Sequence, residues 1–153
     1  MKMKKRLIPI AMAAVMAVGS IPAAGALLDG FNNTSTYSDQ FTDVPSTAWY
    51  YNSVKSAYEL GITAGTSASK FSPDQNLTTD QLTVFLARIH AAYHHNEIVE
   101  VQNPSSWTDK YYYYVEQYID SSYRDSIFGG RDNEQRWHFA YWISKALPDS
   151  AYT

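Results

Sequence analysis

The fold is decided by residues 41–90, which read FTDVPSTAWYYNSVKSAYELGITAGTSASKFSPDQNLTTDQLTVFLARIH. Apolar side chains recur at helical spacing in the first part of this stretch, which predicts an amphipathic helix from about Tyr50 to Leu60. Gly61 suits the left-handed position that commonly ends a helix. The segment Phe71-Ser72-Pro73-Asp74 predicts a turn in the loop that follows.

A second helix start lies at residues 77–82. Thr78 is the expected N-cap, and Gln81 completes a capping box in which the two side chains bond each other's backbone N–H. Leu77 and Leu82 have the spacing of a hydrophobic staple. The following apolar stripe predicts a helix to about His94 with one buried face, formed by Leu82, Phe85, Leu86, Ile89 and Tyr93. Residues 41–95 are therefore expected to form one helix-turn-loop-helix unit.

Residues 104–148 repeat this plan with less fidelity. Trp107 begins the stretch, an apolar helical stripe follows at residues 111–119, Gly129-Gly130 break the chain, and a second stripe occupies residues 139–147. This similarity at a fixed spacing indicates an internal repeat. When Leu82 is aligned with Phe139, Thr79 falls opposite Arg136. A unit of this kind cannot bury its apolar face alone, so the two copies are expected to pack on each other.

The N-terminus has the features of an export signal. A basic segment with Lys2, Lys4, Lys5 and Arg6 precedes the apolar run 7–18, and Ala24-Gly25-Ala26 has the small residues of a cleavage site. The run is shorter than the roughly 20 residues that span a bilayer, so residues 1–26 are expected to be a cleaved signal peptide and no stable membrane anchor. Residues 27–40 are polar and aperiodic, and they are expected to be a flexible linker.

Composition limits the function classes. Removal of the four basic residues of the signal leaves eight Lys and Arg against 15 Asp and Glu, a formal charge of −7. This balance opposes general binding to nucleic acid, which needs many cations to neutralise phosphates. The sequence has no cysteine, so neither disulfides nor an N-terminal lipidated cysteine are expected. An anionic ligand would need a local basic pocket.

The order and spacing of these motifs resemble a repeat of the S-layer homology family. The resemblance covers about 50 residues and rests on Phe41-Thr42-Asp43-Val44, Trp49-Tyr50-Tyr51, Gly61-Ile62-Thr63, Gly65-Thr66 and Phe71-Ser72-Pro73-Asp74. The second copy is similar chiefly at Trp107, at residues 135–140 and at Ala146-Leu147-Pro148. The resemblance implies a mainly α fold of helix-loop-helix repeats, here an incomplete pseudo-threefold bundle because a third copy is missing. It also implies anchoring to the bacterial cell wall through a secondary cell-wall polysaccharide, in many members through a pyruvylated sugar.

Candidate binding residues follow from the resemblance. In the family the second helix starts with Thr-Arg-Ala-Glu or a near variant, and the arginine points into a groove between repeats. Arg136 keeps that arginine in the second copy, whereas the first copy has Thr79. The planar fork of arginine suits a carboxylate, and an aromatic ring suits a sugar face. The predicted ligand-binding residues are Arg136, Arg131 and Trp107 for the second copy, and Trp49, Gly65 and Thr66 for the first.

Structural alternatives to these roles stay open at this point. Core or inter-repeat packing is favoured over ligand stacking for Trp49 and Trp107, because large aromatic side chains dominate small cores. Arg136 equally suits a solvated first-turn position. An assembly fragment of a larger surface protein, which has lost glycan binding and associates with another such chain or with itself, is the alternative function.

An enzyme has weak support in the sequence. His90 and His94 have the i, i+4 spacing of a zinc-binding helix, and Glu97 is close. No glutamate lies between the histidines as in a metalloprotease helix, and no third ligand is evident. We therefore expect no catalytic residue, no metal and no cofactor. The predicted function is a secreted, non-catalytic module at the cell wall or cell surface that binds a wall polysaccharide.

Overall fold

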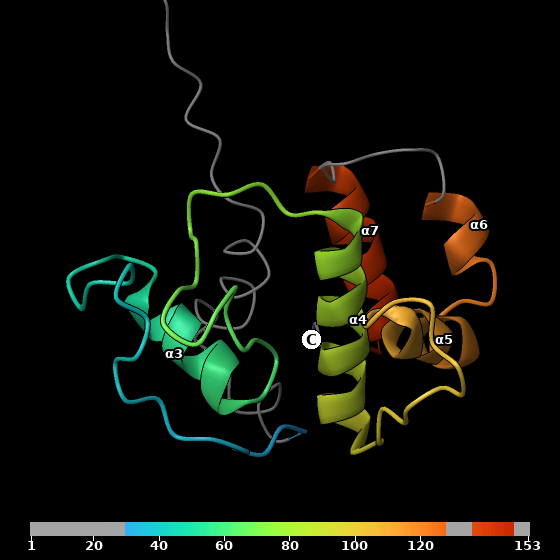
Figure 1. The fold of residues 1–153 in the computed structure, drawn as a ribbon, viewed down its shortest axis with the longest axis horizontal. Helices are drawn as coiled ribbons and strands as arrows, with labels where there is room; N and C mark the ends of the chain where they lie inside the picture. The colour runs from blue at the N-terminus through green and yellow to red at the C-terminus, as the bar shows by residue number, and fades with distance from the viewer. Residues whose placement is uncertain (1–29, 128–135, 149–153) are drawn as a thin grey trace, which may run out of the picture.

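The computed structural model describes residues 30–127 and 136–148, which form a packed set of helices (Figure 1). The helices are α3 (Tyr51–Glu59), α4 (Thr79–His94), α5 (Asp109–Tyr118), α6 (Tyr123–Ile127) and α7 (Arg136–Ala146). The described residues contain no β-strand. They do contain an isolated antiparallel β-bridge between Ser67 and Lys70. The predicted mainly helical fold class is confirmed. The predicted signal peptide at residues 1–26 and the break at Gly129-Gly130 lie outside the described residues.

Helix α3 ends as the sequence predicts. Gly61 has a φ of +72°, in the left-handed region, and its N–H donates to the Tyr58 carbonyl at 3.0 Å. The Ile62 N–H then donates to the Ala57 carbonyl at 2.9 Å, which folds the buried Ile62 back onto the last turn of the helix. The chain then continues into the loop that joins α3 to α4.

Helix α4 starts with the predicted capping box. The Gln81 N–H donates to Thr78 Oγ1 at 3.3 Å, and the Thr78 N–H donates to Gln81 Oε1 at 3.0 Å. Leu77 and Leu82 of the predicted staple are both buried. The helix ends at His94, as predicted, and His95 follows as its C-cap in the left-handed conformation. Side-chain hydrogen bonds therefore set the start of this helix, and a left-handed residue follows its end.

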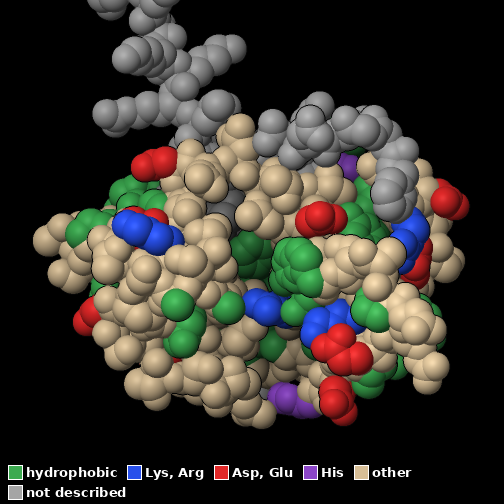
Figure 2. Space-filling model, in the orientation of Figure 1, with side chains coloured by type: hydrophobic (Ala, Val, Ile, Leu, Met, Phe, Trp, Pro, Cys, Tyr) green, Lys and Arg blue, Asp and Glu red, His purple; other side chains and the backbone are tan. Residues whose placement is uncertain are grey.

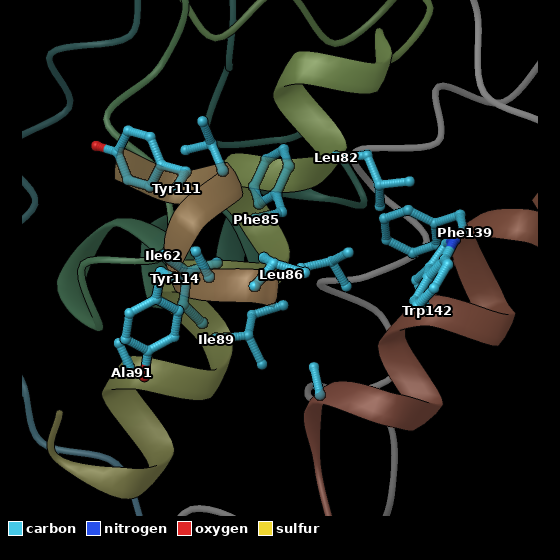
Figure 3. Packing of buried hydrophobic residues seen from close by; sticks show 14 of the residues in the cluster. Ile62, Leu82, Phe85, Leu86, Ile89, Ala91, Tyr111, Tyr114, Phe139 and Trp142 are labelled. Carbon is cyan, nitrogen blue, oxygen red and sulfur yellow. The ribbon is translucent and has the colours of Figure 1, made fainter. Parts of the chain in front are cut away.

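Helix α4 is the centre of the bundle. It packs against both α5 and α7, while α3 and its loop lie on the other side of it (Figure 1). Figure 3 shows Leu82 and Leu86 on the side of Phe139 and Trp142 from α7, and Phe85 toward the side where Tyr111 lies. The predicted stripe is buried except for Tyr93, which is partly buried, but Thr83, Val84, Ala87, His90 and Ala91 are buried as well. The helix buries more than one face because elements from both halves of the chain cover it.

A second, smaller core lies within the first unit. It consists of Tyr37, Phe41, Val44, Val54 and Phe71, with Tyr50, Tyr51 and Tyr58 partly buried around it. Asp43 closes this core, since its carboxylate accepts hydrogen bonds from the backbone N–H groups of Phe71 at 3.0 Å and Ser72 at 2.8 Å. Burial alone would raise the pKa of the Asp43 carboxyl, but these two donors, together with the backbone N–H of Asp43 and the charge of Lys70, lower the pKa below its usual value. The Phe41–Val44 segment is thereby tied to the Phe71–Asp74 turn.

Residues 30–40 differ from the flexible linker that the sequence predicts. Phe31 and Tyr37 are buried, and the backbone N–H groups of Thr34 and Ser35 both donate to the Glu59 carbonyl, at 2.7 and 3.2 Å. The polar composition of this segment hid its two aromatic anchors, which pack on Tyr93 and on Phe41 respectively. The described part of the predicted linker is thus packed on the first unit.

The second half of the chain supplies α5, α6 and α7. Both predicted apolar stripes are helical, but the short helix α6 was not predicted. Tyr123 of α6 is fully buried, where its ring meets Trp142 at a centroid distance of 4.5 Å and its hydroxyl lies 3.0 Å from Thr83 Oγ1 of α4. Tyr118, expected on the buried stripe of α5, is exposed. The boundaries of the second repeat, 104–148, stay a prediction.

Candidate functional site

A pocket of about 350 Å³ lies between the first unit and the start of the second. Its walls come from the loop between α3 and α4, from one side of α4, and from the segment that precedes α5. The lining residues are Ile62, Thr63, Ala64, Gly65, Thr66, Phe71, Ser72, Gln75, Asn76, Leu77, Gln81, Val84, Phe85, Arg88 and Trp107. Figure 2 shows a recess near the middle of this face, with basic side chains beside hydrophobic ones. The volume falls in the range of pockets that hold small organic ligands.

Gly65 shapes the loop wall of the pocket. Its φ is +79°, and a Cβ at this position would lie 2.5 Å from both the Lys70 carbonyl oxygen and a ring carbon of Phe41. Only glycine fits such a close approach in the left-handed region. The Gly65 N–H donates to Thr63 Oγ1 at 3.1 Å, which fixes the loop from its other side.

Thr66 and Ser72 place two hydroxyl groups in the same wall. The Thr66 N–H donates to the Lys70 carbonyl at 2.8 Å, and Thr66 Oγ1 donates to that oxygen at 3.2 Å. Thr66 Oγ1 and Ser72 Oγ lie 2.7 Å apart. Hydroxyl groups held in this way are suited to exchange hydrogen bonds with the hydroxyls of a sugar.

Trp107 forms an aromatic wall. The side chain is 67% exposed, so the interpretation of Trp107 as a core residue is wrong. Its ring meets the edge of the Tyr111 ring at a centroid distance of 6.1 Å. The tryptophan is therefore held at the pocket by a buried tyrosine of α5 while most of its surface stays open to solvent.

Arg88 is the binding candidate that the sequence analysis missed. It lies on α4, it lines the pocket, and Nη2 donates to the Tyr111 hydroxyl at 3.2 Å. Arg88 lies between the buried residues Ala87 and Ile89. In the sequence it therefore resembles an ordinary arginine at the edge of a buried helix face, and the pattern does not indicate a binding role. The signal available was that Arg88 is the only Lys or Arg in α4.

These walls contain parts of the motifs from the loop of the first unit, in the order Ile62-Thr63, Gly65-Thr66 and Phe71-Ser72. Residues 40–81 match the S-layer homology domain. The predicted resemblance is confirmed for this segment. S-layer homology domains are cell-wall anchoring modules that bind wall polymers, and the match implies a location at the cell surface. None of the helices in the described parts of the chain is long and apolar enough to cross a membrane.

The chain also has a curated relative. The chain is 37% identical over 68 residues to an endoglucanase from Bacillus sp. (strain KSM-635). The aligned part covers 44% of this chain and 7% of that relative, so the chain spans a small fraction of the relative's length. No solved structure shows a significant match to the chain.

The S-layer homology segment supplies only part of the pocket. Gly65 and Thr66 lie within residues 40–81, whereas Arg88 and Trp107 lie beyond them. Three of the predicted binding residues, Gly65, Thr66 and Trp107, are thus brought together. The prediction had assigned Trp107 to the second copy and the other two to the first. Their shared pocket joins the loop of the first unit to the segment that precedes α5.

Trp49, Arg131 and Arg136 are not placed in this pocket. Trp49 is absent from its walls, is 61% exposed and packs on Tyr50 at a ring centroid distance of 5.6 Å, so the core interpretation is wrong for Trp49 as well. Arg131 lies outside the described residues. Arg136 is the first residue of α7, and its side chain lies outside what the structure describes. Its predicted role stays a prediction.

His90 and His94 lie next to each other on α4 with ring centroids 4.2 Å apart. His90 is buried, and Nδ1 lies 3.0 Å from the Tyr114 hydroxyl of α5. Burial, with a smaller contribution from His94, lowers the pKa of His90 to about 4. Among the described residues, no three His, Asp or Glu side chains are grouped as a metal ion would require. His90 has a packing role between α4 and α5.

Proposed function

We propose that this chain is a secreted, non-catalytic module that anchors to the bacterial cell wall by binding a secondary cell-wall polysaccharide in the pocket between α4, its preceding loop and Trp107. The observation that carries the proposal is the composition of this pocket. The S-layer homology segment contributes Gly65 and Thr66, and the second half of the chain adds an exposed aromatic ring. A single sugar residue of a polymer has the size for such a pocket.

The chemistry of the walls favours a sugar over a purely apolar ligand. Trp107 offers a flat apolar surface to the face of a sugar ring, and Thr66 and Ser72 offer hydroxyl groups to its edge. Arg88 adds a positive charge in a chain whose formal net charge is −3. An acidic sugar, such as the pyruvylated one that the family resemblance implies, fits this combination.

The endoglucanase relative supports an anchoring role within a larger secreted protein. The aligned part is a small fraction of that relative, so the shared segment is a module and not the whole enzyme. We infer that such a module keeps attached or associated proteins at the wall. We assign no catalytic residue to this chain.

Co-sedimentation with purified walls tests the proposal. Walls from several Gram-positive species are divided, and one half is treated with hydrofluoric acid, which removes the secondary polysaccharide and leaves peptidoglycan. The chain is expected to sediment with the untreated walls of at least one species and to remain in the supernatant with the treated ones. Equal sedimentation with both halves, or none with any species, would overturn the proposal.

Assembly with another chain is the second candidate. The observation that favours it is the pair of exposed aromatic side chains on α7, Trp137 and Tyr141, which are four residues apart and therefore share a face of the helix. This candidate predicts a dimer or larger species in sedimentation velocity at micromolar concentration. A monodisperse monomer that still binds walls would contradict it.

A further inference from the structure

Arg88 is the only charged residue among the described residues that line the pocket. The lining contains no Asp or Glu, although the chain has 15 acidic residues against 12 Lys and Arg. No carboxylate among the described residues lies within salt-bridge distance of the Arg88 guanidinium. The positive charge of Arg88 is therefore available to a ligand.

Lys110 shows the contrast. Its Nζ lies 5.4 Å from the centroid of the Tyr111 ring, similar to the 5.5 Å of Arg88 Cζ from that ring, so both cations lie over one aromatic residue. Lys110 forms an ion pair with Glu100 and is absent from the walls of the pocket. Both cations lie beside Tyr111, but only Arg88 lines the pocket. Lys110 is paired with a carboxylate, whereas Arg88 has no carboxylate partner among the described residues.

Tyr111 fixes the direction of the Arg88 side chain. The tyrosine is buried, and its hydroxyl accepts the hydrogen bond from Arg88 Nη2. Arginine has five N–H donors in a planar fork, so one bond to Tyr111 leaves enough donors for a bidentate contact with a carboxylate. Holding the fork in place before the ligand arrives reduces the entropy lost on binding.

We propose that Arg88 is the specificity-determining residue of this pocket, which selects a sugar bearing a carboxylate, and that Tyr111 is its positioning residue. The proposal rests on the proposed function in that the pocket takes a sugar. It assigns the acid group to the junction of α4 and α5. Arg88 lies nine residues after Thr79, about 14 Å along the helix axis, so this contact is distant from the helix start where the family resemblance places an arginine.

Small saccharide probes test the assignment by NMR titration of the 15N-labelled chain. The acidic probes are methyl glucuronoside and the 4,6-pyruvate ketal of methyl glucoside, and methyl glucoside is the neutral probe. The wild type is expected to bind at least one acidic probe about tenfold more tightly than the neutral one, since a charge-assisted bidentate contact is lost without the acid. Arg88→Gln should abolish this preference. Lys110→Gln, the matched control, should keep it.

Tyr111→Phe tests the positioning role, because it keeps the ring and removes only the hydroxyl. It should weaken binding of the acidic probe by a severalfold larger factor than binding of methyl glucoside, whereas general damage to the pocket would weaken both by the same factor. The proposal is overturned if Arg88→Gln retains the preference for the acidic probe, or if the wild type binds no acidic probe more tightly than the neutral one. If walls bind Arg88→Gln and the wild type equally, the role of Arg88 is contradicted and the anchoring function is not. If the acidic probe binds in a way that depends on Arg88 but the chain binds no walls, the anchoring function is contradicted and the role of Arg88 is not.

Discussion

Arg88 of α4 donates a hydrogen bond from Nη2 to the hydroxyl of Tyr111 of α5 at 3.2 Å, and this bond joins the two halves of the chain at the pocket. The loop wall of the pocket belongs to the first unit, whereas Trp107 and Tyr111 belong to the second. The site therefore exists only when the two units are packed on each other. Neither unit alone holds all of the groups that the proposed glycan would contact.

Asp43→Ala should destabilise the first unit. The substitution removes the acceptor of two charge-assisted hydrogen bonds and leaves the N–H groups of Phe71 and Ser72 without it. We expect the free energy of unfolding to fall by about 2–3 kcal/mol, measured by urea denaturation. Asp39→Ala, which alters an exposed carboxylate bonded to the Tyr51 hydroxyl, is the comparison and should cost less. Equal losses for the two variants would show that Asp43 has no special part in closing the unit.

Asp43 also makes stability depend on pH. Its pKa is lowered in the folded state, so its contribution is present above the unfolded pKa of about 3.9 and is lost as the pH falls through the folded value. Asp43→Asn removes this titration. The variant should therefore lose less stability than the wild type between pH 4 and pH 2, and parallel curves would contradict the role of the two N–H donors.

Gly65→Ala should damage the pocket more than the fold. The new Cβ would meet the Lys70 carbonyl oxygen and the Phe41 ring at 2.5 Å, in a backbone conformation that alanine disfavours by roughly 1–2 kcal/mol. The loop must move to relieve the contact, which displaces Thr66. We expect a loss of stability of about 1–3 kcal/mol and weaker wall binding under conditions where circular dichroism shows the chain still folded. Ala64→Gly, at the neighbouring lining residue, should leave wall binding nearly intact.

His90 should make the chain less stable in mild acid. Its pKa is about 4 in the folded state and about 6.5 when unfolded, so between these values the unfolded chain binds the extra proton. Stability is therefore full above pH 6.5 and falls as the pH drops toward 4, by at most about 3 kcal/mol. His94, Tyr114 and Tyr118 are the groups that face His90, and none of them is a carboxylate that would stabilise its protonated form.

Denaturation curves at several pH values check this prediction. His90→Gln keeps a polar group near Tyr114 but does not titrate, so its stability should vary less than that of the wild type between pH 6.5 and 4.5. His95→Asn changes an exposed histidine at the left-handed C-cap of α4 and is expected to keep the wild-type dependence. A flat wild-type curve over this range would show that His90 is not held neutral by burial.

The parts of the fold that depend on local chemistry were predictable from the sequence. Thr78 and Gln81, three residues apart, form the capping box of α4. Gly61 has the left-handed backbone conformation that ends α3. Neighbouring residues alone are enough to predict both features. Gly65 differs, because its close approach to the Phe41 ring joins residues that are distant in sequence. Gly61 and Gly65 are also among the residues that carry the family resemblance.

The parts that depend on the tertiary arrangement were not predictable in the same way. The exposure of Trp49 and Trp107 depends on what packs over them, and aromatic residues alone favour the core. Phe31 and Tyr37 are buried although they lie in a polar segment, because Tyr93 of α4 and Tyr58 of α3 pack against them. Arg88 became a candidate only when Tyr111 and Trp107, 23 and 19 residues away in sequence, were seen beside it.

The most direct test of the anchoring pocket compares two exposed tryptophans, Trp107 in its wall and Trp49 outside it. The measurement is the dissociation constant for purified secondary wall polysaccharide, obtained by isothermal titration calorimetry with the wild type, Trp107→Ala and Trp49→Ala. Loss of an aromatic contact that the bound glycan covers costs about 1–2 kcal/mol or more, so Trp107→Ala should weaken binding at least about tenfold. The affinity of Trp49→Ala should stay within about twofold of the wild type. Equal affinities for Trp107→Ala and the wild type, or a larger loss for Trp49→Ala, would contradict the assignment of the glycan to this pocket.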